Sequence, residues 1–154
     1  MQTFLPYSDF YKTAECLDYK RLGKQRLETL QIYKSLTEKN YGWKNHPAVK
    51  MWKGYEKELL IYGIIICNEW IKRGYKDTLK ERFIKELFKY QFYFYIDYNG
   101  NFELAKEKIK YPIWLNEEFC KSHQSNLIRK FPEYYKKYFP NVPDNLSYIW
   151  PTKL

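Results

Sequence analysis

The sequence of 154 residues has few cysteines and no long hydrophobic run. Its three cysteines, Cys16, Cys67 and Cys120, are widely spaced, with no CxxC motif and no histidine at metal-ligand spacing. This pattern indicates neither a disulfide framework nor a zinc site, so we expect no metal, no cofactor and a reducing intracellular setting, cytoplasmic or with the genome. The longest apolar run, residues 59–67, is too short to span a bilayer and predicts a buried helix.

The sequence also has few acidic residues relative to basic ones. The chain has 27 lysines and arginines against 18 aspartates and glutamates, which gives a formal charge of +9 and a pI near 9.3. A basic protein of this kind favours a polyanionic partner, and nucleic acid is the first candidate. Aromatic residues make up 21% of the chain. They can fill a core or stack on unpaired bases, and composition alone leaves both uses open.

Apolar residues recur mostly at helical spacing. We expect helices from about Asp9 to Leu36 with an interruption near Gly23, from Pro47 to Arg73, from about Thr78 to Tyr90, and from Asn116 to Lys130. An aromatic run followed by NGN at residues 99–101 allows one small hairpin near residues 92–104. No repeat or low-complexity linker divides the chain. The fold class predicted is therefore mainly α, a single compact helical domain over residues 1–154 with long irregular loops.

Residues 21–28, RLGKQRLE, place one carboxylate on a basic helix. Helical spacing brings Arg21, Lys24 and Gln25 to the face of Glu28. The other side carries Leu22, Arg26, Leu30 and Tyr33. An ordinary surface ion pair between Lys24 and Glu28, worth well under about 1 kcal/mol, would explain the acid without any function. The polar face of this helix nevertheless has its own organisation, with cations around a single acid.

Several blocks of the chain resemble the pyrimidine dimer DNA glycosylase family, also known as phage-type endonuclease V. The blocks are MQTFLPY at residues 1–7, LGKQRLET at 22–29, HPAVKMW at 46–52, CNEWIKRGYKDT at 67–78 and SHQSNLIRK at 122–130. They cover most of residues 1–80 and give weaker support beyond residue 116. Between about residues 80 and 115 the resemblance is absent.

The resemblance implies a glycosylase with abasic-site (AP) lyase activity. In this family the amino group of the first residue attacks C1′ of the damaged nucleotide, forms a Schiff base and nicks the strand by β-elimination. A glutamate on the first long helix assists, and nearby arginines hold phosphates. Carried onto this chain, the catalytic residues are Met1 and Glu28, with Arg21 and Arg26 on the phosphates. An α-amine is a weaker base than a lysine amine, so more of it is neutral near pH 7.5.

Two features depart from the family pattern. The family commonly has its acid directly after an arginine, whereas here Leu27 separates Arg26 from Glu28, so the alignment shifts by one residue. Gln2 is too large for ordinary removal of the initiator methionine, which assigns the free amine to Met1.

Further DNA contacts are expected from side chains spread along the chain. The candidates are Gln2, Lys24, His46, His123, Arg129, Lys136 and Lys137. His46 precedes Pro47 and is equally well placed to cap a helix. The aromatic and basic stretch at residues 134–138 resembles in composition the family segment that lies against the lesion, or it packs on the helices. The expected partner is double-stranded DNA containing a lesion, bound by a monomer, with no membrane.

Two other functions remain open on this evidence. The chain could be a non-catalytic basic module that binds distorted or single-stranded nucleic acid. It could also be a glycosylase of the same fold for a different lesion or modified base, because a pocket can change while fold and chemistry persist. A pyrimidine dimer as the substrate follows from the resemblance alone.

Overall fold

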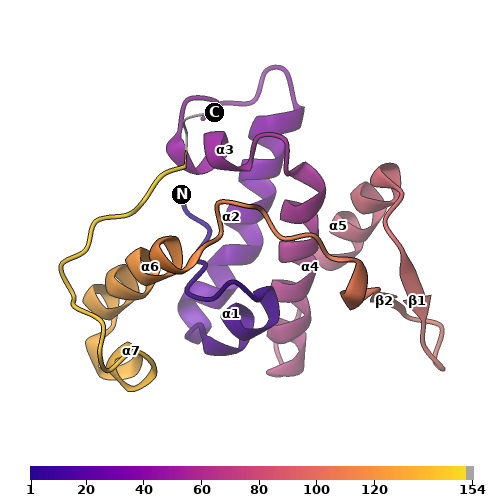
Figure 1. Ribbon diagram of the computed structural model, residues 1–154. Coiled ribbons are helices and arrows are strands. Elements are labelled where there is room, and N and C mark those ends of the chain that lie inside the picture. The colour runs from indigo at the N-terminus through magenta and orange to yellow at the C-terminus, as the bar shows by residue number, and fades with distance from the viewer. Residues whose placement is uncertain (152–154) are drawn as a thin grey trace.

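The computed structural model describes residues 1–151, and this part of the chain is mainly helical (Figure 1). The α-helices are α1 (Phe10–Cys16), α2 (Tyr19–Thr37), α3 (Pro47–Trp52), α4 (Glu56–Lys72), α5 (Lys80–Leu87), α6 (Glu117–Lys130) and α7 (Pro132–Tyr138). Two short 3-10 helices are η1 (Phe88–Tyr90), directly after α5, and η2 (Lys106–Lys108), before α6. The strands β1 (Phe94–Ile96) and β2 (Phe102–Leu104) form one hairpin. The predicted fold class is confirmed.

Helices α2 and α4 pack against each other at the centre, and α1 and α5 cover α4 (Figure 1). The apolar run at residues 59–67 is buried along its whole length, because α4 is enclosed by neighbouring helices. The predicted buried helix is thereby confirmed. None of the helices within residues 1–151 has the length and apolar character that a membrane crossing needs.

The predicted interruption of the first helix near Gly23 was wrong. The helix is interrupted earlier, at Leu17 and Asp18, whose backbone is extended. Helix α2 then continues through Gly23 without interruption. Glycine serves close packing at this position. A Cβ on Gly23 would lie 2.9 Å from the Trp70 ring of α4, so a larger residue would push the two central helices apart.

The predicted long helix from Pro47 to Arg73 was also wrong, because the structure divides it into α3 and α4. Gly54 lies between them with φ of +86°, a conformation that L residues avoid and that no helix contains. The Gly54 amide donates to Oε1 of Glu56 at 3.1 Å, which secures the start of α4. The turn lets α3 leave the line of α4 and pack against α2.

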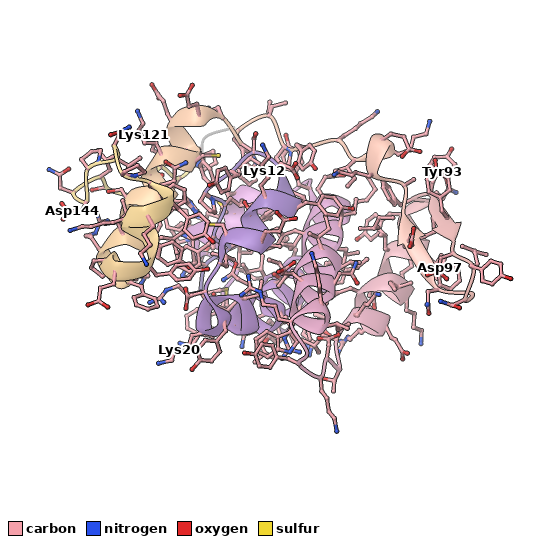
Figure 2. All side chains as sticks on the ribbon, turned by 90° about the horizontal axis from the view of Figure 1, so that it is seen from below. Lys12, Lys20, Tyr93, Asp97, Lys121 and Asp144 are labelled. Atoms are coloured by element: carbon pink, nitrogen blue, oxygen red, sulfur yellow. The ribbon has the colours of Figure 1, made fainter. Side chains whose placement is uncertain are left out.

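The predicted hairpin is confirmed, with Phe94 paired to Leu104 and Gly100 in the turn at φ of +80°. It lies at one end of the molecule. In Figure 2 the hairpin residues Tyr93 and Asp97 are at the opposite end from Lys121 of α6. The hairpin is thus distant from α6.

The cysteines have the packing role that was expected. All three are buried, unpaired thiols. Burial raises the pKa of Cys16 and of Cys120 to about 12, so both remain protonated at neutral pH. Over residues 1–151, no group of histidine, cysteine and acidic side chains is arranged to hold a metal ion.

Candidate active site

Two side chains of α2 hold the beginning of the chain. Oε1 of Gln25 accepts from the Phe4 amide at 2.8 Å, and Nε2 of Gln25 donates to the Gln2 carbonyl at 3.0 Å. One turn further along α2, Oε2 of Glu28 accepts from the Gln2 amide at 2.9 Å. These bonds pair backbone groups of Gln2 and Phe4 with side chains of α2 and hold the N-terminal segment against the helix. They thereby also fix the position of Met1, the residue before Gln2.

Three buried groups from other helices secure the same segment. Nε1 of Trp52 donates to Oγ1 of Thr3 at 2.9 Å, and the Tyr62 hydroxyl donates to the Phe4 carbonyl at 2.8 Å. Nδ1 of His123 accepts from the Leu5 amide at 3.1 Å. Residues 2–5 of the N-terminal segment are therefore buried in the core, while Met1 lies at the surface.

The first residue of this segment, Met1, lies at a pocket of about 560 Å³ that is open to solvent. It is lined by Met1, Gln2, Phe4, Lys20, Arg21, Lys24, Glu28, His46, Lys130, Tyr148 and Trp150. Met1 and Glu28 are both half-buried. The pocket thus brings a primary amine and a carboxylate together among four cations and three aromatic rings. Six of the predicted site residues meet here: Met1, Gln2, Arg21, Lys24, Glu28 and His46.

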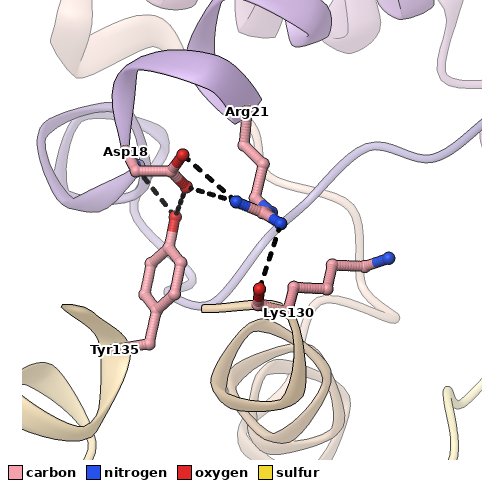
Figure 3. Close-up of polar contacts among 4 residues, drawn as sticks. All are labelled: Asp18, Arg21, Lys130 and Tyr135. Atoms are coloured by element: carbon pink, nitrogen blue, oxygen red, sulfur yellow. Dashed lines mark hydrogen bonds and ion pairs between the residues drawn. The ribbon is translucent and has the colours of Figure 1, made fainter. Parts of the chain in front are cut away.

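A hydrogen-bond network fixes the partly exposed guanidinium of Arg21 (Figure 3). Its Nη1 donates to the carboxylate oxygens of Asp18 at 3.1 and 3.2 Å, and its Nη2 donates to the Lys130 carbonyl at 3.5 Å. The hydroxyl of Tyr135, from α7, donates to the Asp18 carboxylate and accepts from the Asp18 amide at 2.9 Å. Arg21 therefore reaches the pocket in a geometry set by three elements of the fold.

His46 caps a helix, one of the two roles that the sequence left open, and it also lies at the pocket. Its Nδ1 accepts from the Ala48 amide at 3.0 Å and caps α3, and its ring lines the pocket. Burial and the ammonium group of Met1 lower the pKa of His46, while Glu28 partly opposes the shift. At neutral pH a neutral imidazole thus lies near the terminal amine.

Arg26 does not reach the pocket. Its Nη1 pairs with Oδ1 of Asp77 at 2.6 Å, and its guanidinium lies 4.7 Å from the centre of the Trp70 ring. Oδ2 of Asp77 in turn accepts from the Leu79 and Lys80 amides, at 3.1 and 2.7 Å, at the start of α5. The structure thus places Arg26 in the packing of α2 against the segment before α5.

Four other predicted residues also lie outside the pocket. His123 is fully buried, and burial lowers its pKa to about 3, so it is a neutral core residue. Arg129 is exposed, yet it donates to the Leu146 carbonyl at 2.7 Å and to Oγ of Ser125 at 3.2 Å. Lys136 and Lys137 are exposed on α7 and do not line the pocket.

Five pocket residues were missed from the sequence: Phe4, Lys20, Lys130, Tyr148 and Trp150. Helical spacing could have found Lys20, which lies four residues before Lys24 and eight before Glu28. The two aromatic residues of the tail carry no comparable signal, since their place depends on the course of the chain after α7.

A family model described as pyrimidine dimer DNA glycosylase matches residues 1–82, which is more than half of the chain. The matched part includes the N-terminal segment, α2 and His46. No curated protein and no solved structure matches the chain.

Proposed function

The chain belongs to the pyrimidine dimer DNA glycosylase family, and from this premise we propose that it excises a damaged base through the amine of Met1 and then nicks the strand. Family membership makes it a DNA repair glycosylase. The observation that carries the finer proposal is that Met1 and Glu28 line one pocket, with the Gln2 amide bonded to Glu28.

In the first step the neutral amine of Met1 donates its electron pair to C1′ of the target nucleotide. The bond between C1′ and the base breaks, and the base leaves with the bonding electrons and takes up a proton. The nitrogen loses a proton as the new bond forms. Positive charge develops on the sugar during this step, and the carboxylate of Glu28 is placed to stabilise it.

In the second step the C1′–O4′ bond breaks, O4′ takes up a proton, and C1′ becomes a protonated imine of the Met1 nitrogen. Removal of a proton from C2′ then expels the 3′ phosphate with the electrons of its C–O bond, which cuts the strand. A carboxylate can accept and return protons in these transfers, and Glu28 is the acid that lines the pocket.

The cations of the pocket supply the contacts to DNA. Arg21 is held in a fixed orientation and is suited to a phosphate oxygen, while Lys20, Lys24 and Lys130 contribute charge around the opening. We propose a pyrimidine dimer in duplex DNA as the lesion, because a strand already distorted by a crosslink is less costly to open.

Trapping with borohydride tests the nucleophile. The protein is incubated with a duplex that contains one abasic site, reduced, digested and mapped by mass spectrometry. We expect one adduct on the Met1 nitrogen, and acylation of the α-amine beforehand should abolish it. Absence of an adduct, or an adduct on Lys20 or Lys24, would contradict the assignment. Binding of damaged duplex without any strand scission would favour the non-catalytic module instead.

A further inference from the structure

The loop that joins α2 to α3, residues 38–46, carries an exposed tryptophan beside the pocket. The loop lies at the end of α2 that is remote from α1 (Figure 1). Trp43 is 62% exposed. Its ring meets the ring of His46 edge-on, with 6.1 Å between the centres, and His46 lines the pocket. Trp43 is not itself a lining residue, so it lies just outside the pocket.

The backbone holds Trp43 in an unusual conformation. Its φ is +68°, and within residues 1–151 Gln91 is the only other residue besides glycines with a positive φ. A bulky residue is disfavoured in this conformation, because its Cβ lies too close to a carbonyl oxygen of the backbone. Glycine would adopt the same conformation at no steric cost. An exposed ring on a strained backbone adds little to folding, which favours a role in binding.

Hydrogen bonds around Trp43 keep the loop in place. The His46 amide donates to the Trp43 carbonyl at 2.9 Å. Nζ of Lys44 donates to the Ser35 and Glu38 carbonyls at 3.0 and 2.7 Å, which ties the loop to the end of α2. The indole is therefore carried on a fixed support, and little order has to be gained when a ligand binds.

The surface around Trp43 is basic. The segment between α2 and α4, residues 38–55, has one acidic residue, Glu38, and four exposed lysines, Lys39, Lys44, Lys50 and Lys53. The hairpin also exposes aromatic rings, but residues 92–110 contain three acidic residues and three lysines. An exposed ring among cations matches a polyanion that has planar bases, which is nucleic acid.

We infer that the indole of Trp43 inserts between base pairs of the bound duplex, next to the lesion, and holds the duplex kinked there. The inference rests on the proposed function, which places the reacting sugar at Met1. Base pairs are about 3.4 Å apart along a strand. The centre of the Trp43 ring is 6.1 Å from that of His46 at the pocket, so the indole is within a few base steps of the reacting nucleotide. The lysines of the loop then contact phosphates of the bent strand.

The ligand is therefore a weakened base step of duplex DNA beside a lesion. An inserted side chain has to unstack one step, and damage that already disturbs the stack lowers this cost. The two bases of a pyrimidine dimer stay joined to each other, and the indole enters at a flanking step rather than between them. Trp43 acts in the selection of damaged DNA and not in the chemistry at C1′.

A duplex with a tetrahydrofuran site separates binding from cleavage, because this abasic analogue cannot form a Schiff base. Affinities for the analogue duplex and for an undamaged duplex are measured by fluorescence anisotropy. We expect Trp43→Ala to weaken binding of the analogue duplex on the order of tenfold, and binding of the undamaged duplex by less than about twofold. Trp43→Phe should retain most of the affinity because a ring remains.

Trp43→Gly distinguishes a binding role from a structural one. The change removes the ring and suits the positive φ. The midpoint of thermal unfolding should stay the same or rise, while affinity for the analogue duplex should fall as it does in Trp43→Ala. A loss of thermal stability in both variants would show that the ring supports the fold, and it would overturn the inference.

Tyr98→Ala is the matched control. Tyr98 is also a fully exposed ring, but it lies in the charge-balanced hairpin. Its replacement should change neither affinity. The emission of Trp43, taken as the difference between the wild type and Trp43→Phe, should be quenched by the analogue duplex and not by the undamaged one.

Equal weakening of Trp43→Ala on both duplexes would mean that Trp43 contacts the DNA surface without entering the stack. Unchanged affinity for the analogue duplex would mean that Trp43 makes no useful contact with DNA. Either result overturns the inference. None of these measurements requires cleavage, so the absence of a borohydride adduct on Met1 would overturn the proposed function without altering them.

Discussion

The backbone amide of Gln2 donates a hydrogen bond of 2.9 Å to Oε2 of Glu28. This bond joins the residue next to the terminal amine to the one carboxylate that lines the pocket. The same carboxylate therefore positions the start of the chain and faces the space where a sugar would react. The two roles make different demands, since the first needs an acceptor atom and the second needs a negative charge.

Glu28→Gln separates these two roles. The amide oxygen of glutamine still accepts from Gln2, whereas the charge that would stabilise the developing cation is lost. We expect cleavage of an abasic duplex to fall between about a hundredfold and ten-thousandfold. Affinity for the same duplex, measured by fluorescence anisotropy, should stay within about twofold or increase. A variant that cleaves at the wild-type rate would show that Glu28 is only a structural acceptor.

Tyr135→Phe tests whether α7 positions Arg21. The change removes the hydroxyl that donates to Asp18 and accepts from its amide, so the carboxylate that orients Arg21 is less well held. We expect DNA affinity to fall severalfold, in addition to a loss of roughly 1 to 3 kcal/mol in the free energy of unfolding.

A double-mutant comparison distinguishes positioning from general destabilisation. In an Arg21→Ala background, Tyr135→Phe should still lower stability but should cost no further DNA affinity. Tyr134→Phe is the control, because Tyr134 lies on the same helix and makes no hydrogen bond to Asp18. An unchanged effect of Tyr135→Phe on affinity in the Arg21→Ala background would contradict the coupling.

Arg21 and Arg26 should give opposite phenotypes although they are five residues apart on α2. Arg26→Ala leaves Asp77, whose side chain is 1% exposed, without its ion-pair partner. We expect a loss of roughly 3 kcal/mol in the free energy of unfolding. Arg21→Ala should mainly weaken DNA binding and lower the slope of affinity against salt concentration by about one. Thermal unfolding and binding titrations at several salt concentrations measure the two effects. Loss of affinity in folded Arg26→Ala protein would return Arg26 to the phosphate contacts.

Local sequence signals predicted the elements of the fold better than their boundaries. Periodicity found most of the helical segments, though not α7, and the turn residues found the hairpin, because both signals depend on neighbours in the chain. Gly23 and Gly54 were misjudged because their roles differ. Gly23 admits the Trp70 ring from another helix, while Gly54 adopts a positive φ that ends α3. Nothing in the local sequence distinguishes these two uses of glycine.

In the candidate site, too, residues on one helix could be grouped from the sequence, whereas contacts between distant segments could not. Helical spacing was sufficient to group Arg21 and Lys24 with Glu28, since all three lie on one helix. The ion pair of Arg26 was not foreseen because its partner, Asp77, is 51 residues away and joins it only through the packing of α2 against the segment before α5. Tyr148 and Trp150 were missed because their position follows from hydrogen bonds between the tail and α6 that no spacing rule reveals.

Burial of His123 makes the stability of the protein depend on pH. Its pKa falls from 6.5 to about 3 on folding, because the core disfavours the charged ring. Below pH 6.5 the unfolded chain binds a proton that the folded chain does not. Stability from this group is therefore complete above pH 6.5 and is lost progressively as the pH falls toward 3. Between pH 6.5 and 5 the loss is about 2 kcal/mol.

His123→Asn isolates this contribution, because the asparagine oxygen can replace Nδ1 as the acceptor for the Leu5 amide and does not titrate. The variant is expected to be less stable than the wild type at pH 7, since it loses ring contacts in the core. The difference between the two proteins should shrink by about 2 kcal/mol at pH 5. His46 is shifted in the same direction and is present in both proteins, so it cancels in the comparison. Urea unfolding at the two pH values measures the effect, and a constant difference would mean that His123 takes up its proton without unfolding.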